Sequence, residues 1–481
     1  MSELYTLTLA EAAAKLQSRQ ISAREITADC LARMEVTEPT VQACLTVMAD
    51  QALEEAARLD QAGPDPAKPL WGLPLTLKDL YCTKGIRTTA ASRMLESYLP
   101  NYDAEVVTRL KAAGAVMLAK TNLDEFAMGS STEFSAFGPS RNPWDPTKVP
   151  GGSSGGAAAS VAAYQTPGAL GTDTGGSIRQ PAALCGCVGL KPTYGRVSRY
   201  GILALGSSLD QPGPLARRVG DCARLLQVMA GPDERDGAVS TRPVDDYVSA
   251  VPAKLKGMKL GLPAELWEGR LDPDVAAVIR GAAKVLEEAG AELKLISFPN
   301  LRYSVAAYYI LATAEGSTNM ARFDGVHFGH RSKDPKDLNE LYTASRSEGL
   351  GPEVKRRILL GTFALSSGYY DAYFKKAAQI RRLIRDDYYS ALEICDFLCA
   401  PVASLPAWDF GSFIDDPVTA YQLDLMTLPV NLAGLPGLSL PAGLGPESRL
   451  PVGLQLIGRP FGERDLLSAG LAFEEIFPPL L

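Results

Sequence analysis

Histidine is almost absent from this chain, since only His327 and His330 occur among its 481 residues. A catalytic triad that needs a histidine, or a metal site built from imidazoles, therefore has very few candidates. The eight cysteines are scattered and form no paired CxxC motif. This argues against a structural zinc site and fits reduced thiols in a cytoplasmic protein. No basic residue precedes Lys15, so we expect no secretory signal.

A strong charge of either sign is also lacking, because the net charge is only −7. Such a chain does not wrap nucleic acid over its whole surface, although a local basic face is compatible with this value. Two long stretches carry no charge, 149–172 and 425–446. The first is mostly glycine, serine and alanine, and prolines interrupt the second, so we expect buried strands and loops rather than membrane spans.

Helical and strand patterns alternate along the rest of the chain. Ser22 and Glu25 have the spacing of a capping box, and Asp272-Pro273 has the sequence of a helix start. The periodicity predicts strands over 73–80, 116–119 and 293–298, and a helix over 104–113. Helices placed between strands imply an α/β fold with a single large mixed sheet covered on both faces. No repeat or linker divides the sequence, so we expect one domain over 1–481.

Glycine is concentrated in the middle of the chain, with 13 glycines in the 67 residues from Gly129 to Gly195. Two segments stand out, Gly-Gly-Ser-Ser-Gly-Gly at 151–156 and Asp-Thr-Gly-Gly-Ser at 173–177. Neither matches GxxxxGK[ST] or GxGxxG, and no lysine follows closely, which disfavours a phosphate-binding loop. Tight turns between buried elements, or a loop that presents a nucleophile, are the other interpretations.

A serine nucleophile would need a base. Ser153 fits GxSxG formally, but Val149-Pro150 precedes it and no histidine follows position 330, so a Ser-His-Asp triad is disfavoured. We interpret both histidines as structural. A lysine can act as the base when burial lowers its pKa, and Lys78 ends an apolar strand. A surface lysine whose stem lies along apolar groups fits the composition of that segment equally well.

Three motifs resemble the amidase signature family. They are Gly72-x-Pro74-x-x-x-Lys78-Asp79, the segment 151–156, and Asp173-x-Gly-Gly-Ser177-Ile-Arg-x-Pro181. Their order matches, as do the spacings of 75 residues from Lys78 to Ser153 and 24 from Ser153 to Ser177. The segment 207–214 is also similar. Ala157 departs from the family, where many members have serine or glutamate, but it lies outside the catalytic set.

The resemblance implies a Ser-cisSer-Lys triad. Ser177 would be the nucleophile, Ser153 would follow a cis peptide bond and bridge to Lys78, and Lys78 would be the base. The backbone N–H groups of Thr174, Gly175, Gly176 and Ser177 would form the oxyanion hole. Adjacent glycines agree with this role, because they let consecutive N–H groups converge on one point.

The sequence beyond this signature core, which spans about 65–215, resembles the branch of the family that hydrolyses glutamine for tRNA-dependent amidotransferases. Segments at 308–310, 321–325, 353–358, 361–371 and 427–434 carry this similarity. The resemblance implies that L-glutamine is bound by Tyr308, Arg357 and Asp424, within pocket elements at about 300–435. A cation for the α-carboxylate and an anion for the α-ammonium suit this substrate. Arg356 stays an alternative to Arg357.

The same resemblance implies partners. Ammonia would pass to subunits B and C of a heterotrimer. These subunits would use ATP and Mg²⁺ to activate a misacylated tRNA, either Glu-tRNA(Gln) or Asp-tRNA(Asn). We expect no cofactor in this chain and no membrane contact. Residues 355–385 hold eight basic residues and one acidic residue, a pattern that fits a solvated helix face or a subunit contact better than a tRNA contact. A free-standing amidase for another amide and a non-catalytic nucleotide-binding module are the rival functions.

Overall fold

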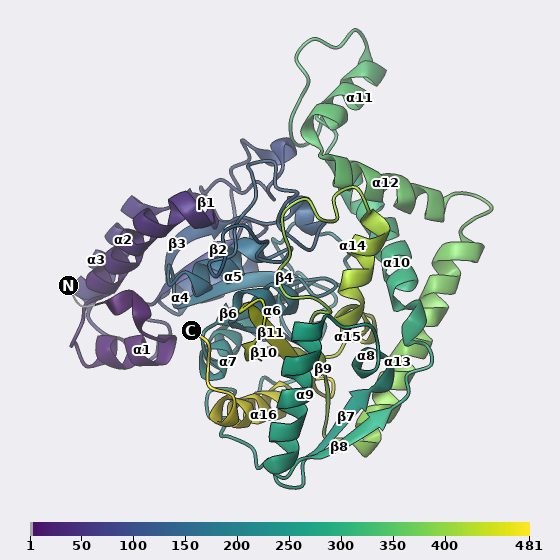
Figure 1. Ribbon diagram of the computed structural model, residues 1–481. Helices are drawn as coiled ribbons and strands as arrows, with labels where there is room; N and C mark the ends of the chain where they lie inside the picture. Colours follow the sequence, from purple (N-terminus) through teal and green to yellow (C-terminus); the bar gives the residue numbers. More distant parts are fainter. Residues whose placement is uncertain (1–2) are drawn as a thin grey trace.

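One sheet of eleven strands organises the molecule (Figure 1). The computed structural model describes residues 3–481. The strands are β1 (Cys44–Val47), β2 (Pro74–Lys78), β3 (Val116–Thr121), β4 (Gly168–Asp173), β5 (Val188–Lys191), β6 (Gln211–Ala216), β7 (Lys259–Pro263), β8 (Glu292–Ile296), β9 (Phe397–Pro401), β10 (Gly437–Leu444) and β11 (Pro451–Ile457). They lie in the order β1-β3-β2-β4-β6-β5-β10-β11-β9-β7-β8, with parallel and antiparallel pairs.

The direction of β2 and β4 brings two of the sequence motifs together. These neighbouring strands are parallel, with Leu75 opposite Gly168 and Leu77 opposite Leu170. Their carboxyl ends, Lys78 and Asp173, therefore lie at the same edge of the sheet. Loops that follow such ends are where ligands bind in many α/β proteins.

Sixteen α-helices lie within the described residues. They are α1 (Leu9–Gln17), α2 (Ala23–Val41), α3 (Ala49–Ala62), α4 (Glu105–Ala112), α5 (Gly155–Ala162), α6 (Arg179–Cys185), α7 (Val219–Met229), α8 (Ala264–Trp267), α9 (Pro273–Glu288), α10 (Ser304–Asn319), α11 (Leu338–Gly349), α12 (Pro352–Leu365), α13 (Lys376–Ile394), α14 (Pro417–Gln422), α15 (Leu428–Ala433) and α16 (Glu463–Ile476). In Figure 1, α10, α12, α13 and α14 gather on one side of the sheet, away from the N-terminal helices.

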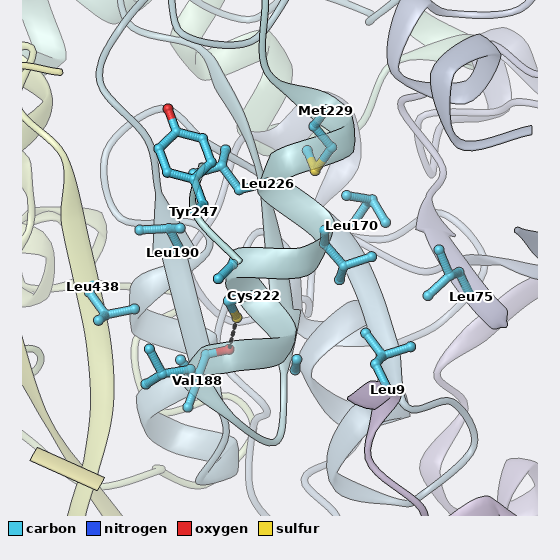
Figure 2. Close-up of a cluster of buried hydrophobic side chains, with 14 of the residues drawn as sticks. Leu9, Leu75, Leu170, Val188, Leu190, Cys222, Leu226, Met229, Tyr247 and Leu438 are labelled. Atoms are coloured by element: carbon cyan, nitrogen blue, oxygen red, sulfur yellow. Dashed lines mark hydrogen bonds between the residues drawn. The ribbon is translucent and has the colours of Figure 1, made fainter. Parts of the chain in front are cut away.

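The two faces of the sheet bury different cores. Leu170 of β4 packs in the cluster that contains Cys222 and Leu226 of α7 (Figure 2), whereas its neighbour Ala169 packs with the alanines of α5 and α6. Adjacent strand residues point to opposite faces, so helices cover both sides. The predicted α/β fold with one mixed, doubly covered sheet is confirmed.

Several local predictions agree with the structure. The Ser22 side chain accepts a hydrogen bond from the Glu25 N–H at 3.1 Å, and the Glu25 carboxylate accepts one from the Ser22 N–H at 2.7 Å, which closes the capping box at the start of α2. Asp272 caps α9 through the Asp274 N–H. The strand expected over 73–80 is shorter, because the chain turns after Lys78 and the Leu80 N–H donates to the Lys78 carbonyl at 2.7 Å.

The uncharged stretches contain helices as well as strands, which corrects the prediction of strands and loops alone. Residues 155–162 form α5, and 428–433 form α15. All eight residues of α5 are buried, so this helix has no polar stripe and no amphipathic period to reveal it. The proline in α15 lies in its first turn, where the missing N–H costs nothing. No helix within residues 3–481 is both long enough and apolar enough to cross a bilayer.

Candidate active site

Lys78 lies at the buried end of β2, and its side chain has no solvent exposure. Its Nζ is within hydrogen-bonding distance of three hydroxyls: Ser153 Oγ at 2.8 Å, Ser154 Oγ at 2.9 Å and Thr172 Oγ1 at 2.9 Å. The surface-lysine alternative is therefore wrong. Ser154 and Thr172 had not been singled out from the sequence, because only the folded loops bring their hydroxyls to the end of β2.

Burial lowers the pKa of Lys78 to about 7, although the carboxylates of Asp124, Asp173 and Asp210 oppose this shift. Desolvation disfavours the charged ammonium, which has no carboxylate in direct contact. A large share of Lys78 is therefore neutral near pH 7. A neutral amine can donate to two of its three hydroxyl neighbours and accept a proton from the third, which is the requirement for a general base.

The first glycine-rich loop holds Ser153 next to this amine. The Gly152–Ser153 peptide bond is cis, as the resemblance implied. The Gly152 N–H donates to Gln180 Oε1 at 2.9 Å, and the Ser154 N–H donates to the Ser177 carbonyl at 3.1 Å, so this loop is attached to the second one. Residues 151–156 are buried, which leaves no open cradle for a phosphate.

Ser177 is in the second loop, between β4 and α6. It is 8% exposed and lines a pocket, unlike Lys78 and Ser153, which are wholly buried. Of these three side chains, Ser177 alone is therefore partly exposed. This arrangement places the predicted nucleophile where a substrate can reach it and the predicted base where water cannot.

Only some of the predicted oxyanion donors are free in this loop. The Gly176 N–H donates to Asp173 Oδ1 at 2.8 Å. Within residues 3–481, the N–H groups of Thr174, Gly175 and Ser177 donate to no protein acceptor, so they are the donors available to an oxyanion. Gly176 has φ of +136°, and a Cβ there would lie 2.1 Å from Thr427 Oγ1. Position 176 therefore requires glycine, both because φ is positive and because a Cβ has no room there.

A buried ion pair between Arg179 and Asp173 supports the loop that carries Ser177. Arg179 donates to Asp173 from Nε at 3.0 Å and from Nη2 at 3.1 Å, and both side chains are fully buried. Asn431 of α15 donates to Asp173 Oδ1 at 2.8 Å and accepts from Arg179 Nη2 at 2.6 Å. Burial raises the pKa of Asp173, but the Arg179 guanidinium more than offsets it and the pKa falls to about 2.

Replacing Arg179 by methionine is expected to destabilise the protein by about 3–5 kcal/mol, because the Asp173 carboxylate would stay buried without its counter-ion. Differential scanning calorimetry would measure this as a melting temperature several degrees below wild type. Arg58→Met is the matched control, since the Arg58–Glu55 pair is exposed and contributes little. Equal melting temperatures for the two variants would contradict the structural role of the buried pair.

The residues expected to bind glutamine line the same small pocket as Ser177. Tyr308 comes from α10, Arg357 from α12 and Asp424 from the 3₁₀-helix η7 (Leu423–Met426). The sequence places these residues more than a hundred positions after Ser177. The fold brings all four together, although their roles in binding stay predictions.

Arg357 is better placed than Arg356 for the substrate carboxylate. The Arg357 side chain is buried, and its Nε donates to Glu353 Oε1 at 2.8 Å, which leaves its two terminal nitrogens for a ligand. Arg356 is paired with the other oxygen of Glu353, is 39% exposed and does not line the pocket around Ser177. Burial lowers the pKa of Arg357, but Tyr309 and Glu353 outweigh this and hold it above the ordinary value.

Sequence reasoning missed three further side chains at this site: Tyr309 lines the pocket around Ser177, and Glu353 and Tyr421 line an adjoining hollow. The Tyr309 hydroxyl donates to Asp424 Oδ2 at 2.6 Å. The Tyr309 ring stacks on the Tyr421 ring with centroids 3.8 Å apart, and the Tyr421 hydroxyl donates to Glu353 Oε1 at 2.9 Å. The spacing of Glu353 and Arg357, four residues apart on a helix, was the one sequence signal for this network.

A second hollow, the outer pocket, adjoins this inner pocket. It shares Gly129, Ser130, Tyr309 and Arg357 with the inner pocket, and residues 408–423 form much of its wall. The two hollows therefore adjoin at Tyr309 and Arg357.

Neither histidine takes part in the site. His327 Nδ1 pairs with Asp324 Oδ2 at 2.7 Å, and His330 Nε2 pairs with Glu348 Oε2 at 2.6 Å. Neither residue lines the inner or the outer pocket. The interpretation of both as structural agrees with this placement.

Comparison with known proteins identifies the class of protein. The amidase family model matches residues 25–467. The crystal structure of a bacterial aryl acylamidase of the amidase signature family has a TM-score of 0.86 at 26% identity, with 99% of this chain and 97% of that chain covered. The chain belongs to the amidase family, as its motifs indicated.

Within this family, the chain is similar to one kind of protein. The A subunit of glutamyl-tRNA(Gln) amidotransferase from Oleidesulfovibrio alaskensis is 57% identical over 99% of this chain and 98% of the relative. The protein of the same name from Geotalea daltonii is 54% identical, with 98% of each chain covered. The crystal structure of the Thermotoga maritima protein of this name has a TM-score of 0.83 at 41% identity, covering 99% of this chain and 96% of that chain.

Proposed function

We propose that this chain is the glutamine-hydrolysing A subunit of a tRNA-dependent amidotransferase. The observation that carries the proposal is the inner pocket, in which Ser177 lies together with a buried arginine and a carboxylate. Full-length similarity to proteins named as the A subunit of glutamyl-tRNA(Gln) amidotransferase supports the same function.

The charges in the pocket suit the head of an amino acid. The two free nitrogens of Arg357 can take an α-carboxylate bidentately, and Asp424 can take an α-ammonium. The carboxamide at the other end of glutamine then points toward Ser177. A simple aliphatic or aryl amide would leave the two charged groups of this partly desolvated pocket without partners, which costs binding free energy.

In the first half of the reaction, Ser177 Oγ attacks the carboxamide carbon of glutamine. Its proton passes to Ser153, whose own proton passes to the neutral Lys78 amine. The carbonyl oxygen becomes an oxyanion that accepts from the free N–H groups of the loop, each worth about 3–4 kcal/mol of barrier. The C–N bond then breaks, the proton returns through Ser153 to the leaving nitrogen, and ammonia departs from a glutamyl ester on Ser177.

In the second half, water replaces ammonia. Lys78 and Ser153 take a proton from the water as it attacks the ester carbon, and the proton returns to Ser177 Oγ as the C–O bond breaks. The products are glutamate and ammonia. No step requires a metal or an organic cofactor on this chain.

Ammonia would be used elsewhere in an assembly. We propose a heterotrimer with subunits B and C in the cytoplasm, in which a partner binds ATP and Mg²⁺ and activates a misacylated tRNA. The exposed lysines of 355–385, such as Lys375 and Lys376, suit a subunit contact or a solvated face, whereas Arg357 and Arg381 of the same segment are directed inward.

The alternative within the family is a free-standing amidase for another amide, which the fold of the aryl acylamidase makes reasonable. The chain should be assayed alone and with subunits B and C, against glutamine and a panel of simple amides. Ammonia release from glutamine by the assembled complex is expected. Turnover of simple amides by the lone chain, with no use of glutamine in either state, would support the alternative instead.

A further inference from the structure

Tyr309 contacts the carboxylate proposed to bind the α-ammonium of glutamine. Its hydroxyl donates to Asp424 Oδ2 at 2.6 Å, while its ring is fixed between neighbours. Tyr421 stacks on one side at 3.8 Å, and Tyr308 meets it edge-on with centroids 5.1 Å apart. The hydroxyl therefore has little freedom to move, and the carboxylate that it holds is fixed with it.

This hydrogen bond affects both the orientation and the charge of Asp424. Because Tyr309 holds Oδ2, the orientation of the whole carboxylate in the pocket depends on this hydrogen bond. Burial raises the pKa of Asp424, whereas the Tyr309 hydroxyl, Ser130 and Arg357 lower it and Asp173 raises it further. Loss of the hydroxyl would leave a carboxylate that rotates and that binds its proton more tightly.

We propose that Tyr309 is a positioning residue that makes the pocket selective for amides bearing an α-ammonium group. This inference rests on the proposed function and deepens it. The Tyr309 hydroxyl acts through Asp424, whereas the Tyr309 ring lies 5.2 Å from Arg357 Cζ, so only a change that keeps the ring separates the two ends of the substrate.

The neighbouring Tyr308 should behave differently from Tyr309. A Cβ at Gly175 would lie 2.7 Å from the Tyr308 hydroxyl, so that hydroxyl lies beside the oxyanion loop. Replacing Tyr308 by phenylalanine should affect every amide that reaches Ser177. Replacing Tyr309 should affect only those with an amino group for Asp424.

The test compares glutamine with glutaramate, which keeps the carboxylate and the carboxamide but lacks the amino group. In the assembled complex, Tyr309→Phe keeps the ring stack and removes one charge-assisted hydrogen bond. We expect the KM for glutamine to rise about ten- to a hundredfold, with kcat nearly unchanged. The inhibition constant of glutaramate should stay within about twofold of wild type, because it makes no contact that depends on Asp424 orientation. Tyr303→Phe, an exposed change just before α10, is the matched control.

The pH profile is a second measurement, because a purely structural role of Tyr309 would leave it unchanged. Glutamine binding needs Asp424 ionised, and the variant has a higher Asp424 pKa, so the rise of KM for glutamine at acid pH should begin at a higher pH in the variant than in wild type. Equal weakening of glutamine and glutaramate, or an unchanged KM for glutamine with the same pH dependence as wild type, would overturn the inference. Failure of the wild-type complex to hydrolyse glutamine would instead refute the proposed function, so the two failures are distinguishable.

Discussion

Replacing Ser177 by alanine is expected to abolish the use of glutamine. The variant keeps the pocket, the charges of Arg357 and Asp424 and the buried Lys78, but it has no atom that can form the glutamyl ester. Removing the nucleophile of a triad enzyme lowers turnover by about 10⁴-fold or more. Release of ammonia from glutamine by the assembled complex measures this loss directly.

The same variant should still support amidation of the tRNA when ammonium salt replaces glutamine. Ser177 has no part in the ATP-dependent step, which we assign to a partner in the complex. Ser390→Ala, an exposed serine on α13, is the control for both assays. Glutamine-dependent activity within about tenfold of wild type in Ser177→Ala would show that another group is the nucleophile.

Replacing Lys78 by methionine should lower kcat for glutamine by about 10²–10⁴-fold, which is the usual contribution of a general base. Methionine fills a similar volume and has no charge, but it cannot accept a proton from Ser153. Lys376→Met, an exposed lysine on α13, is the control for the same substitution without burial. Stopped assays of glutamate formation over a long incubation would detect the residual rate.

The pH dependence of the wild-type enzyme tests the same base. The active form of Lys78 is the neutral amine, and burial lowers its pKa to about 7. Below this pH the amine is protonated, so kcat/KM for glutamine should fall about tenfold per pH unit and should level off above it. An acid limb centred near pH 9 or above, or a flat profile from pH 5 to pH 9, would contradict a neutral buried lysine.

The three proposed catalytic residues could be selected from the sequence because each belongs to a short local motif. Lys78 follows an apolar strand, and Ser153 and Ser177 stand beside glycines at fixed spacings. The mixed sheet could be expected from the alternation of helices and strands. Helix α5 could not, since a helix buried on every side has no polar face and therefore no periodic pattern.

The second layer of the site depends on contacts between distant segments. Tyr309, Glu353 and Tyr421 come from α10, α12 and α14, and their roles arise from two hydrogen bonds and a ring stack that no local pattern specifies. Likewise, Asp173 occupies the Gly176 N–H, so one of the four predicted oxyanion donors is engaged inside the protein. Such details depend on side-chain and backbone geometry within the folded loops.

The most direct test of the proposed chemistry is peptide mapping by mass spectrometry after incubation with 6-diazo-5-oxo-norleucine, an electrophile shaped like glutamine. The chain should be treated both alone and assembled with subunits B and C, beside a Lys78→Ala variant. We predict a single adduct on Ser177 that excess glutamine blocks and that the variant does not form. An adduct on a different residue, or none in the assembled wild-type complex, would contradict a glutaminase whose nucleophile is Ser177 and whose base is Lys78.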